Sequence, residues 1–314
     1  MESLLDKVIC IVGPTATGKS DLAQNIALEL DGEIISADSM QVYKGMDIGT
    51  GKIPIDQRRV MHHGLDLVYP NEPYSAALFQ EYARRTFKEV RSRKHASILA
   101  GGTGFYVRAA IDNYDFPKGE QVDNPIRKEL VEYLDKNGTD ALWNRLKSVD
   151  PKSAECIHKN NSKRVMRALE LYADGKSYAN QLEKLSKIEQ LVPALMIGLS
   201  VSPDTLAKRI DTRVDKMREL GLEQEVERLL EEGFEEWITA PQAIGYKEIV
   251  SAKRGECTID DAFQSIKQAT RRYAKRQRTW FRKDRRIVWI DAETGNMTHM
   301  LEQVLQVIEN PTNK

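Results

Sequence analysis

The sequence predicts an α/β fold, in which helices flank a parallel sheet and a helical insertion interrupts the chain. Short apolar runs alternate with helical stretches over the first hundred residues, a pattern typical of strand–helix–strand units. Between about Asp115 and Leu191 the pattern is helical and charged, with no convincing strand. We therefore expect an α/β core formed by residues 1–115 and 191–314, and a helical insertion domain over residues 116–190.

Three strands and two helices are expected before the insertion. The run Lys7–Val12 is continuous and β-branched, as a strand buried on both faces should be. Glu33–Ala37 and Ser97–Ala100 predict the next two strands. The spacing of apolar residues predicts helices over Ser20–Leu30 and Ala76–Arg93. In such a sheet, ligands bind outside the carboxyl ends of the strands.

Sheet building is expected to resume after the insertion. Leu191–Val201 is again β-like, and Arg286–Ile290 predicts a late strand. Between them, the chain after Pro203 reads as mainly helical. The second half thus completes the sheet that the first half begins.

Composition excludes several classes of protein. The 314 residues are 41% apolar and 30% charged, which is ordinary for a soluble globular protein and excludes a disordered or fibrous one. The 47 basic and 47 acidic residues balance, which excludes a globally cationic nucleic-acid binder but not one with segregated charge. No window approaches the roughly 18 apolar residues of a membrane span. Cys10, Cys156 and Cys257 are isolated, as in reduced cytoplasmic proteins. With no leader peptide at the start of the chain, we expect a cytoplasmic monomer without membrane association.

Charge is segregated along the second half. Glu219–Trp237 contains eight glutamates and one arginine, which we interpret as a solvated helix face. Arg271–Arg286 contains nine lysines or arginines, interleaved with Tyr273, Trp280 and Phe281. Guanidinium groups and stackable rings suit a nucleic-acid backbone and its unstacked bases. A solvated helix face remains the alternative for this basic segment.

Eight consecutive residues carry the clearest chemical signal. They match GxxxxGK[ST] in full: Gly13, Pro14, Thr15, Ala16, Thr17, Gly18, Lys19 and Ser20. The match follows a buried strand and opens a helix, as the phosphate loops of nucleotide-binding and ATP-binding proteins do. Lys19 is expected to bridge the outer phosphates, and the Ser20 hydroxyl to ligate Mg²⁺. The fold is therefore expected to be P-loop NTPase-like, with a bound di- or triphosphate whose carrier the motif does not specify.

Two further candidates follow the predicted strands at the same edge of the sheet. Asp38 has three possible roles there: holding Mg²⁺ through water, binding a substrate hydroxyl, or acting as a general base. The alternative is a helix cap or a surface acid. Ser39 and Gln41 add polar groups able to read a base edge. Thr103, within Gly101–Gly104, could reach a phosphate or an acceptor, and a tight turn is its alternative.

One absence weakens the reading as a nucleotide hydrolase. Such enzymes show a further strand that ends in an acid, which holds Mg²⁺ and orients water. Here the strand Ser97–Ala100 ends in glycine, and only Asp38 qualifies. Group transfer to a second substrate remains, and a small-molecule or nucleotide kinase is the default prediction from the loop alone.

A longer series of motifs resembles one particular family, the bacterial tRNA dimethylallyltransferases. The resemblance begins with GPTATGKS and is most specific in the block from Asp38 to Gly49. It covers essentially the whole chain, and the segments that carry it after the phosphate loop are Ala37–Lys52, Leu99–Tyr106, Asn161–Glu170, Arg213–Gly221, Gln242–Lys247 and Arg276–Arg282.

The resemblance implies a reaction. The family transfers a dimethylallyl group from dimethylallyl diphosphate, with Mg²⁺, to N6 of the adenosine at tRNA position 37, beside the anticodon. By analogy, Asp38 would be the general base. The catalytic and diphosphate-binding groups would be Thr15, Lys19, Ser20, Thr103 and Arg213. The role of Arg213 rests on the resemblance alone. A kinase and a non-catalytic nucleotide-dependent RNA binder are the competing classes.

The resemblance also implies an RNA interface, with the helical insertion gripping the anticodon stem. Its tRNA-facing residues would be Asp38, Ser39, Met40, Gln41, Lys163, Arg164, Val165, Met166, Arg167, Gln242, Ala243, Ile244, Gly245, Tyr246 and Lys247. The basic segment adds Arg276, Arg278 and Arg282 as expected tRNA contacts.

Overall fold

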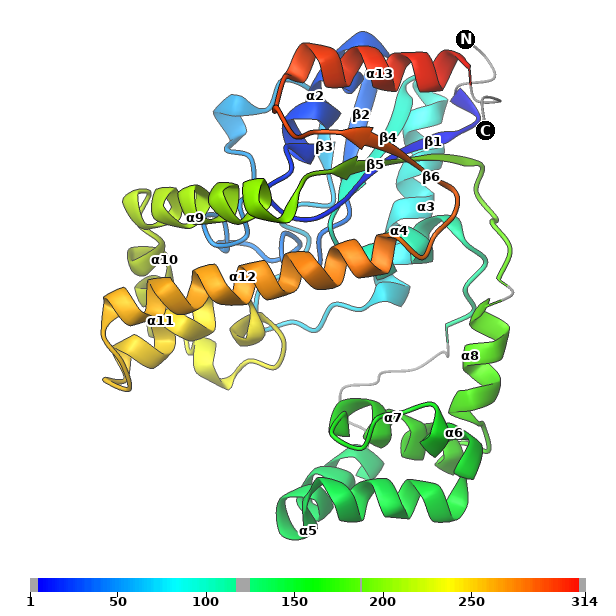
Figure 1. Cartoon of the computed structure of the whole chain (residues 1–314), viewed down its shortest axis with the longest axis vertical. Helices are drawn as coiled ribbons and strands as arrows, with labels where there is room; N and C mark the ends of the chain where they lie inside the picture. Colours follow the sequence, from blue (N-terminus) through cyan, green and yellow to red (C-terminus); the bar gives the residue numbers. More distant parts are fainter. Residues whose placement is uncertain (1–4, 117–124, 187, 311–314) are drawn as a thin grey trace. The chain divides into compact units, whose positions relative to one another are not determined.

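The chain forms two compact units in the computed structural model, which describes residues 5–116, 125–186 and 188–310 (Figure 1). Residues 1–111 and 191–314 make up the first unit, and residues 112–190 the second. The segment predicted to be a helical insertion, 116–190, thus belongs to the second unit. Residues 117–124, part of that prediction, lie outside the described residues.

The first unit is built on a parallel sheet. In the described residues it has six strands, in the order β3-β2-β4-β1-β5-β6. The strands are β1 (Val8–Val12), β2 (Gly32–Ser36), β3 (His62–His63), β4 (Ala96–Gly101), β5 (Ala194–Ser200) and β6 (Ile287–Asp291). Val12, the last residue of β1, pairs with Gly101 of β4 and Gly198 of β5. This register brings the carboxyl ends of the central strands to one edge, as predicted for a parallel α/β sheet.

The five predicted strands are confirmed as β1, β2, β4, β5 and β6, and β3 was not predicted. Two histidines show no apolar pattern, so β3 depends on tertiary contacts. The Glu33 carboxylate on β2 contacts His63 Nε2 at 2.6 Å and also binds Arg93 and His95. These hydrogen bonds, chiefly that of Arg93, lower the pKa of Glu33 to about 2, so the carboxylate is charged and ties the edge strand to its neighbour.

Helices cover both faces of this sheet and extend past its carboxyl edge. The helices of the first unit are α2 (Lys19–Glu29), α3 (Ala76–Ser92), α4 (Gly104–Ile111), α9 (Pro203–Glu219), α10 (Leu222–Glu231), α11 (Tyr246–Lys253), α12 (Ile259–Phe281) and α13 (Met297–Glu309). Figure 1 shows α2 and α13 packed together on one side of the sheet, and α3 and α4 on the other. Helices α9 and α12 pack against each other beyond the strand ends.

The main core lies between the sheet and these helices. Every residue of β1 and β2 is buried, and Ile9 and Ile11 are completely inaccessible to solvent. Strand β1 is flanked by strands and covered on both faces, which explains its continuous apolar run in the sequence. The core therefore holds the strand ends rigidly at the edge where the ligand site is expected.

The second unit is helical and has its own core. Its helices are α5 (Pro125–Val149), α6 (Pro151–Glu155), α7 (Ser162–Ala173) and α8 (Tyr178–Ser186). Gly138, at φ 79°, divides α5 into two helical segments. Leu142, Leu146 and Val165 are fully buried at the centre of this unit. Among the described helices of both units, none combines the length and the apolarity that crossing a membrane requires.

Candidate functional site

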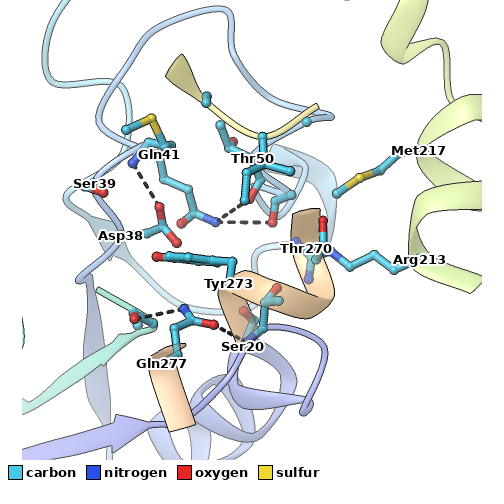
Figure 2. A pocket seen from close by; sticks show the side chains of 18 of the residues that line it. Ser20, Asp38, Ser39, Gln41, Thr50, Arg213, Met217, Thr270, Tyr273 and Gln277 are labelled. Carbon is cyan, nitrogen blue, oxygen red and sulfur yellow. Dashed lines mark hydrogen bonds between the residues drawn. The ribbon is translucent and has the colours of Figure 1, made fainter. Parts of the chain in front are cut away.

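A cavity of about 340 Å³ lies at the carboxyl edge of the sheet. Figure 2 shows side chains from several separate segments that converge on it. Its lining comes from the phosphate loop (residues 13–20), the loop after β2, the end of β4, helix α9, the segment 242–247 and helix α12. All of these belong to the first unit. The volume is in the range of small-molecule sites.

The phosphate loop has the backbone geometry that its glycines allow. Gly13 and Gly18 adopt φ values of 140° and 88°, and Gly18 immediately precedes α2. A Cβ at Gly13 would also lie 3.0 Å from the carbonyl oxygen of Leu199 on β5. Thr17 braces the loop by donating its hydroxyl to the Pro14 carbonyl at 2.9 Å. The start of α2 therefore faces the cavity with the partial positive charge of a helix N-terminus.

Two cations and one carboxylate meet in the cavity. Lys19 comes from the phosphate loop, Arg213 from α9 and Asp38 from the loop after β2. Burial lowers the pKa of Lys19 to about 7; the charge of Arg213 lowers it too, and that of Asp38 opposes the change. Burial also lowers the pKa of Arg213, again opposed by Asp38. The cavity thus holds two partly buried cations, an arrangement that suits a multiply charged anion.

The Arg213 guanidinium occupies space that only a glycine at position 51 leaves open. A Cβ at Gly51 would lie 1.9 Å from Nη2 of Arg213, so a side chain there would displace the guanidinium. Gly51 also has a φ of 64°, in the left-handed region. Sequence pattern does not distinguish Arg213 from the other arginines of α9. Its selection depends on how α9 packs over the loop after β2.

Asp38 is held in a defined orientation. Its Oδ1 accepts a hydrogen bond from the Met40 N–H at 2.9 Å. The next residue, Ser39, donates its N–H to the hydroxyl oxygen of Thr103 at 3.0 Å. Thr103, in turn, donates its own N–H to Ala37 at 3.2 Å. Thr103 therefore positions the loop that carries Asp38. The Asp38 carboxylate points into the cavity (Figure 2), which Lys19 also lines.

The Gln41 amide hydrogen-bonds within the protein. Its Nε2 donates to the carbonyls of Thr50 and Gly51 at 3.2 and 3.3 Å, and its Oε1 accepts from Ser36 at 2.8 Å. The sequence suggested a group able to read a base edge. In the structure this amide closes the loop between β2 and Gly51, because both ends of the side chain meet backbone or hydroxyl partners. Gln41 also lines the cavity, and its contact with a base stays a prediction.

The three glycines around Thr103 make room for neighbouring protein. A Cβ at Gly101 would lie 2.2 Å from the Ala37 carbonyl oxygen. At Gly102 it would lie 2.3 Å from Nε2 of Gln277, and at Gly104 it would lie 2.2 Å from Trp280 Cδ1. The close approach expected from the glycines is therefore confirmed, and its partners in this structure are the loop after β2 and helix α12.

Glu225 holds the loop after β2 from the opposite side. Its carboxylate is buried and accepts the N–H groups of Asp47, Ile48 and Gly49 at 2.8 to 3.1 Å. Glu225 belongs to the acidic stretch that we interpreted as a solvated face. That interpretation is wrong for this residue. Three successive backbone N–H groups of the loop donate hydrogen bonds to the carboxylate and replace the water that would otherwise solvate it.

Tyr246 is fully buried behind the same loop. Its hydroxyl donates to Glu225 at 2.6 Å, and burial raises its pKa well above the usual value. A Cβ at Gly49 would lie 2.4 Å from its ring. The expectation that the Tyr246 side chain faces RNA is therefore wrong: the ring supports the loop from within the core.

Comparison with known proteins identifies the family. The family described as IPP transferase matches residues 41–284, and isopentenyl transferase matches residues 6–63. The chain belongs to the IPP transferase family. It is 45% identical over 302 residues to the tRNA dimethylallyltransferase of Carboxydothermus hydrogenoformans, covering 96% of each chain. It is 40% identical over 301 residues to that of Staphylococcus carnosus, covering 95% of each chain.

Solved structures of the family share the fold. One is the tRNA delta(2)-isopentenylpyrophosphate transferase of Staphylococcus epidermidis, with a TM-score of 0.71 at 38% identity, covering 97% of this chain and 99% of that one. Another is a eukaryotic dimethylallyltransferase acting on tRNA, with a TM-score of 0.78 at 29% identity, covering 97% and 78%. The α/β fold and the family resemblance are thus confirmed.

The structure divides the residues expected to face tRNA in this family into accessible and buried ones. On α7, Lys163 and Arg164 are exposed, whereas Val165 and Met166 pack in the core of the second unit. Arg167 is partly exposed and pairs with Glu170 at 3.1 Å. The expectation for Val165 and Met166 is wrong at the level of side chains, because a helix packed on one side must bury about half of its residues.

The remaining predicted segments lie at the cavity or on α12. Gln242, Ala243, Ile244 and Lys247 line the cavity, and Gly245, at φ 102°, is the N-cap residue that precedes α11. Arg276 also lines the cavity, with its guanidinium 5.5 Å from the centre of the Tyr273 ring. Arg278 is partly exposed and Arg282 is exposed. Helix α12 therefore presents basic side chains outward beside the cavity.

Proposed function

We propose that this chain is a tRNA dimethylallyltransferase. It transfers the dimethylallyl group of dimethylallyl diphosphate to N6 of the adenosine at tRNA position 37, beside the anticodon, and releases diphosphate. The observation that carries the proposal is the convergence of Lys19, Arg213 and Asp38 on one cavity. Curated relatives with near-complete coverage have this activity in their names, and none of those reported above is a kinase.

The donor diphosphate binds between the phosphate loop and α9. Lys19 and Arg213 neutralise its charge, and the N–H groups at the start of α2 add further donors. Thr15 and Ser20 line the same wall of the cavity. As charge develops on the leaving diphosphate, these cations stabilise it more strongly than they stabilise the intact donor.

The residues present fit a magnesium ion bound mainly through the donor. The Ser20 hydroxyl would supply an oxygen ligand of the kind that Mg²⁺ prefers. Among the described residues there is no cluster of three acidic, histidine or cysteine side chains that would hold a metal alone. Ser20 would hold the ion together with diphosphate oxygens, and the ion would supply further neutralisation of the leaving group's charge.

Asp38 accepts the proton that the acceptor loses. The N6 lone pair is delocalised into the adenine ring, so the amine is a weak nucleophile that a carboxylate cannot deprotonate beforehand. The C1–O bond of the allylic donor breaks early, and N6 attacks the electron-poor C1. The N6–H becomes acidic only as the N–C bond forms, and its proton passes to Asp38. Diphosphate leaves with the bonding electrons of the C1–O bond.

The adenine reaches this cavity only by leaving the anticodon-loop stack. The segments 38–41 and 242–247 border the cavity and contact the extruded nucleotide and its neighbours. Arg276, Arg278 and Arg282 contact backbone phosphates, as do Lys163, Arg164 and Arg167 of the helical unit. The second unit, residues 112–190, grips the anticodon stem.

One assay separates this function from its alternatives. The full chain is incubated with tRNA and either radiolabelled dimethylallyl diphosphate or γ-labelled ATP. Transfer of the dimethylallyl label to the RNA supports the proposal. Label from ATP would indicate a kinase, and no transfer from either would indicate an RNA binder.

Donor affinity should fall as pH rises above 7. In the free protein Lys19 has a pKa of about 7, and a bound diphosphate raises that pKa. Above pH 7, binding therefore takes up a proton, and the Kd for dimethylallyl diphosphate without tRNA should rise by up to about tenfold per pH unit. Calorimetry in two buffers of different ionisation enthalpy measures the uptake. Lys19→Met should abolish it, and a flat profile in the wild type would contradict the assignment.

Affinity for tRNA should depend steeply on salt, because phosphate contacts release counterions. Replacing Arg276 and Arg278 with Ala should reduce the slope of log K against log salt by about 1 to 2 and raise the KM for tRNA. The KM for the donor should barely change. The control is Arg85→Ala with Lys88→Ala, two exposed basic residues of α3. Equal losses for both substrates would indicate a folding defect instead.

A further inference from the structure

Gln277 joins the two glycine-rich loops of the cavity. This residue of α12 is only 5% exposed. Its Oε1 accepts the N–H of Thr15, in the phosphate loop, at 2.9 Å, and its Nε2 donates to the carbonyl of Gly102 at 2.9 Å (Figure 2). One side chain from a distant part of the sequence thus bridges the β1–α2 loop and the β4–α4 turn.

The Gln277 amide packs directly against the backbone of Gly102 in the β4–α4 turn. A Cβ at Gly102 would lie 2.3 Å from Nε2 of Gln277, so glycine is needed for the amide to approach. Gly102 does not have a positive φ, so its backbone would accept alanine. The requirement for glycine at this position therefore comes from Gln277 and not from the conformation of the turn.

An amide is suited to this position. Thr15 offers a donor and Gly102 offers an acceptor, and only a group with both functions satisfies the two at once. A carboxylate of the same length would oppose the Gly102 carbonyl. A thioether of similar length would leave both backbone groups unsatisfied in a buried place, which is costly.

Helix α12 also carries Arg276 and Arg278, which we assign to RNA. Thr270, Tyr273 and Arg276 line the cavity on the same helix as Gln277, and Arg278 follows it directly. Tyr273 lies within one helical turn of Gln277, beside Asp38 (Figure 2). A shift of α12 caused by RNA bound at Arg276 and Arg278 would therefore move Gln277, and with it the phosphate loop.

We propose that Gln277 is a positioning residue of the transfer reaction, which holds the phosphate loop in its diphosphate-binding geometry and links it to α12. RNA bound to α12 thereby raises the affinity of the cavity for the diphosphate donor. The link to RNA rests on the function proposed above. The positioning of the phosphate loop does not, because it concerns diphosphate binding alone.

The first test compares Gln277→Met with Gln268→Met, the same substitution at an exposed site of α12. Loss of two buried hydrogen bonds should raise the KM for dimethylallyl diphosphate by roughly 10- to 100-fold in Gln277→Met. The Kd for tRNA measured without the donor should stay unchanged, and Gln268→Met should behave as wild type. A lower melting temperature with both values unchanged would mean that Gln277 only packs, and would overturn the proposal.

Gly102→Ala provides a second route, which does not alter Gln277 itself. The added methyl group displaces the amide, so this variant should show the same selective rise in KM for the donor. Because both changes break one bridge, the double variant Gly102→Ala/Gln277→Met should be hardly worse than either single one. Additive effects, or an effect of Gly102→Ala on the KM for tRNA alone, would contradict the proposal.

The second test measures the link to RNA. The Kd of inorganic diphosphate is determined with and without saturating tRNA. In the wild type and in Gln268→Met, tRNA should tighten diphosphate binding by roughly 5- to 150-fold, and in Gln277→Met this factor should fall to near one. No effect of tRNA in the wild type would overturn the link. If the wild type binds diphosphate normally but transfers nothing to tRNA, the proposed function fails while the positioning role is still decided by the variants.

Discussion

Replacing Asp38 with Asn is expected to lower kcat by about 10²- to 10⁴-fold, the usual contribution of a general base. Asparagine keeps the shape and can still accept the Met40 N–H through its Oδ1, so the loop after β2 should stay in place. It cannot take the proton that N6 releases. Single-turnover rates with prebound tRNA and donor isolate this step. The binding of both substrates should change little.

A matched control separates the base from a metal ligand. Asp56→Asn, on the exposed turn Ile55–Gln57, should leave the rate unchanged. If the Asp38→Asn defect disappears at raised Mg²⁺ concentration, or consists mainly of lost donor binding, Asp38 is a metal ligand. The assignment as the base is then wrong.

Replacing Lys19 with Ala is expected to lower kcat/KM by at least about 10²-fold, the scale of one preorganised electrostatic donor. The ammonium group contacts the diphosphate most strongly as the C1–O bond breaks, so kcat should fall as well as affinity. Steady-state kinetics with the donor varied measure both quantities. Lys88→Ala, on the exposed face of α3, is the control. An unchanged rate in Lys19→Ala would remove the phosphate loop from the catalytic mechanism.

The phosphate loop, the buried strands and the residues that follow them could be predicted from short stretches of consecutive residues. The phosphate loop consists of eight consecutive residues, and its glycines set its backbone geometry, so a local sequence pattern is enough to predict it. The buried strands are recognisable because both of their faces must be apolar. Asp38 and Thr103 follow such strands, and parallel pairing then brings them to one edge.

Which side of a helix faces the core could not be predicted from consecutive residues. A charged helix has the same composition whichever side faces the core, so Arg213 and Glu225 do not stand out from their neighbours. The burial of Tyr246 depends on the packing of α11 against the loop after β2, and β3 exists through contacts of Glu33.

The amino-acid sequence was enough to predict the α/β class, the phosphate loop and the strand-end residues, because each follows from local backbone chemistry and apolar periodicity. Which side chains of α9 and α12 line the cavity depends on tertiary packing, as does the buried position of Glu225 of α10 behind the loop after β2. Gln277 lies 262 residues from the Thr15 amide that it accepts, and no local pattern specifies a partner at that separation. Gln277 bonds to Thr15 and Gly102 because α12 packs across both glycine-rich loops in the assembled core.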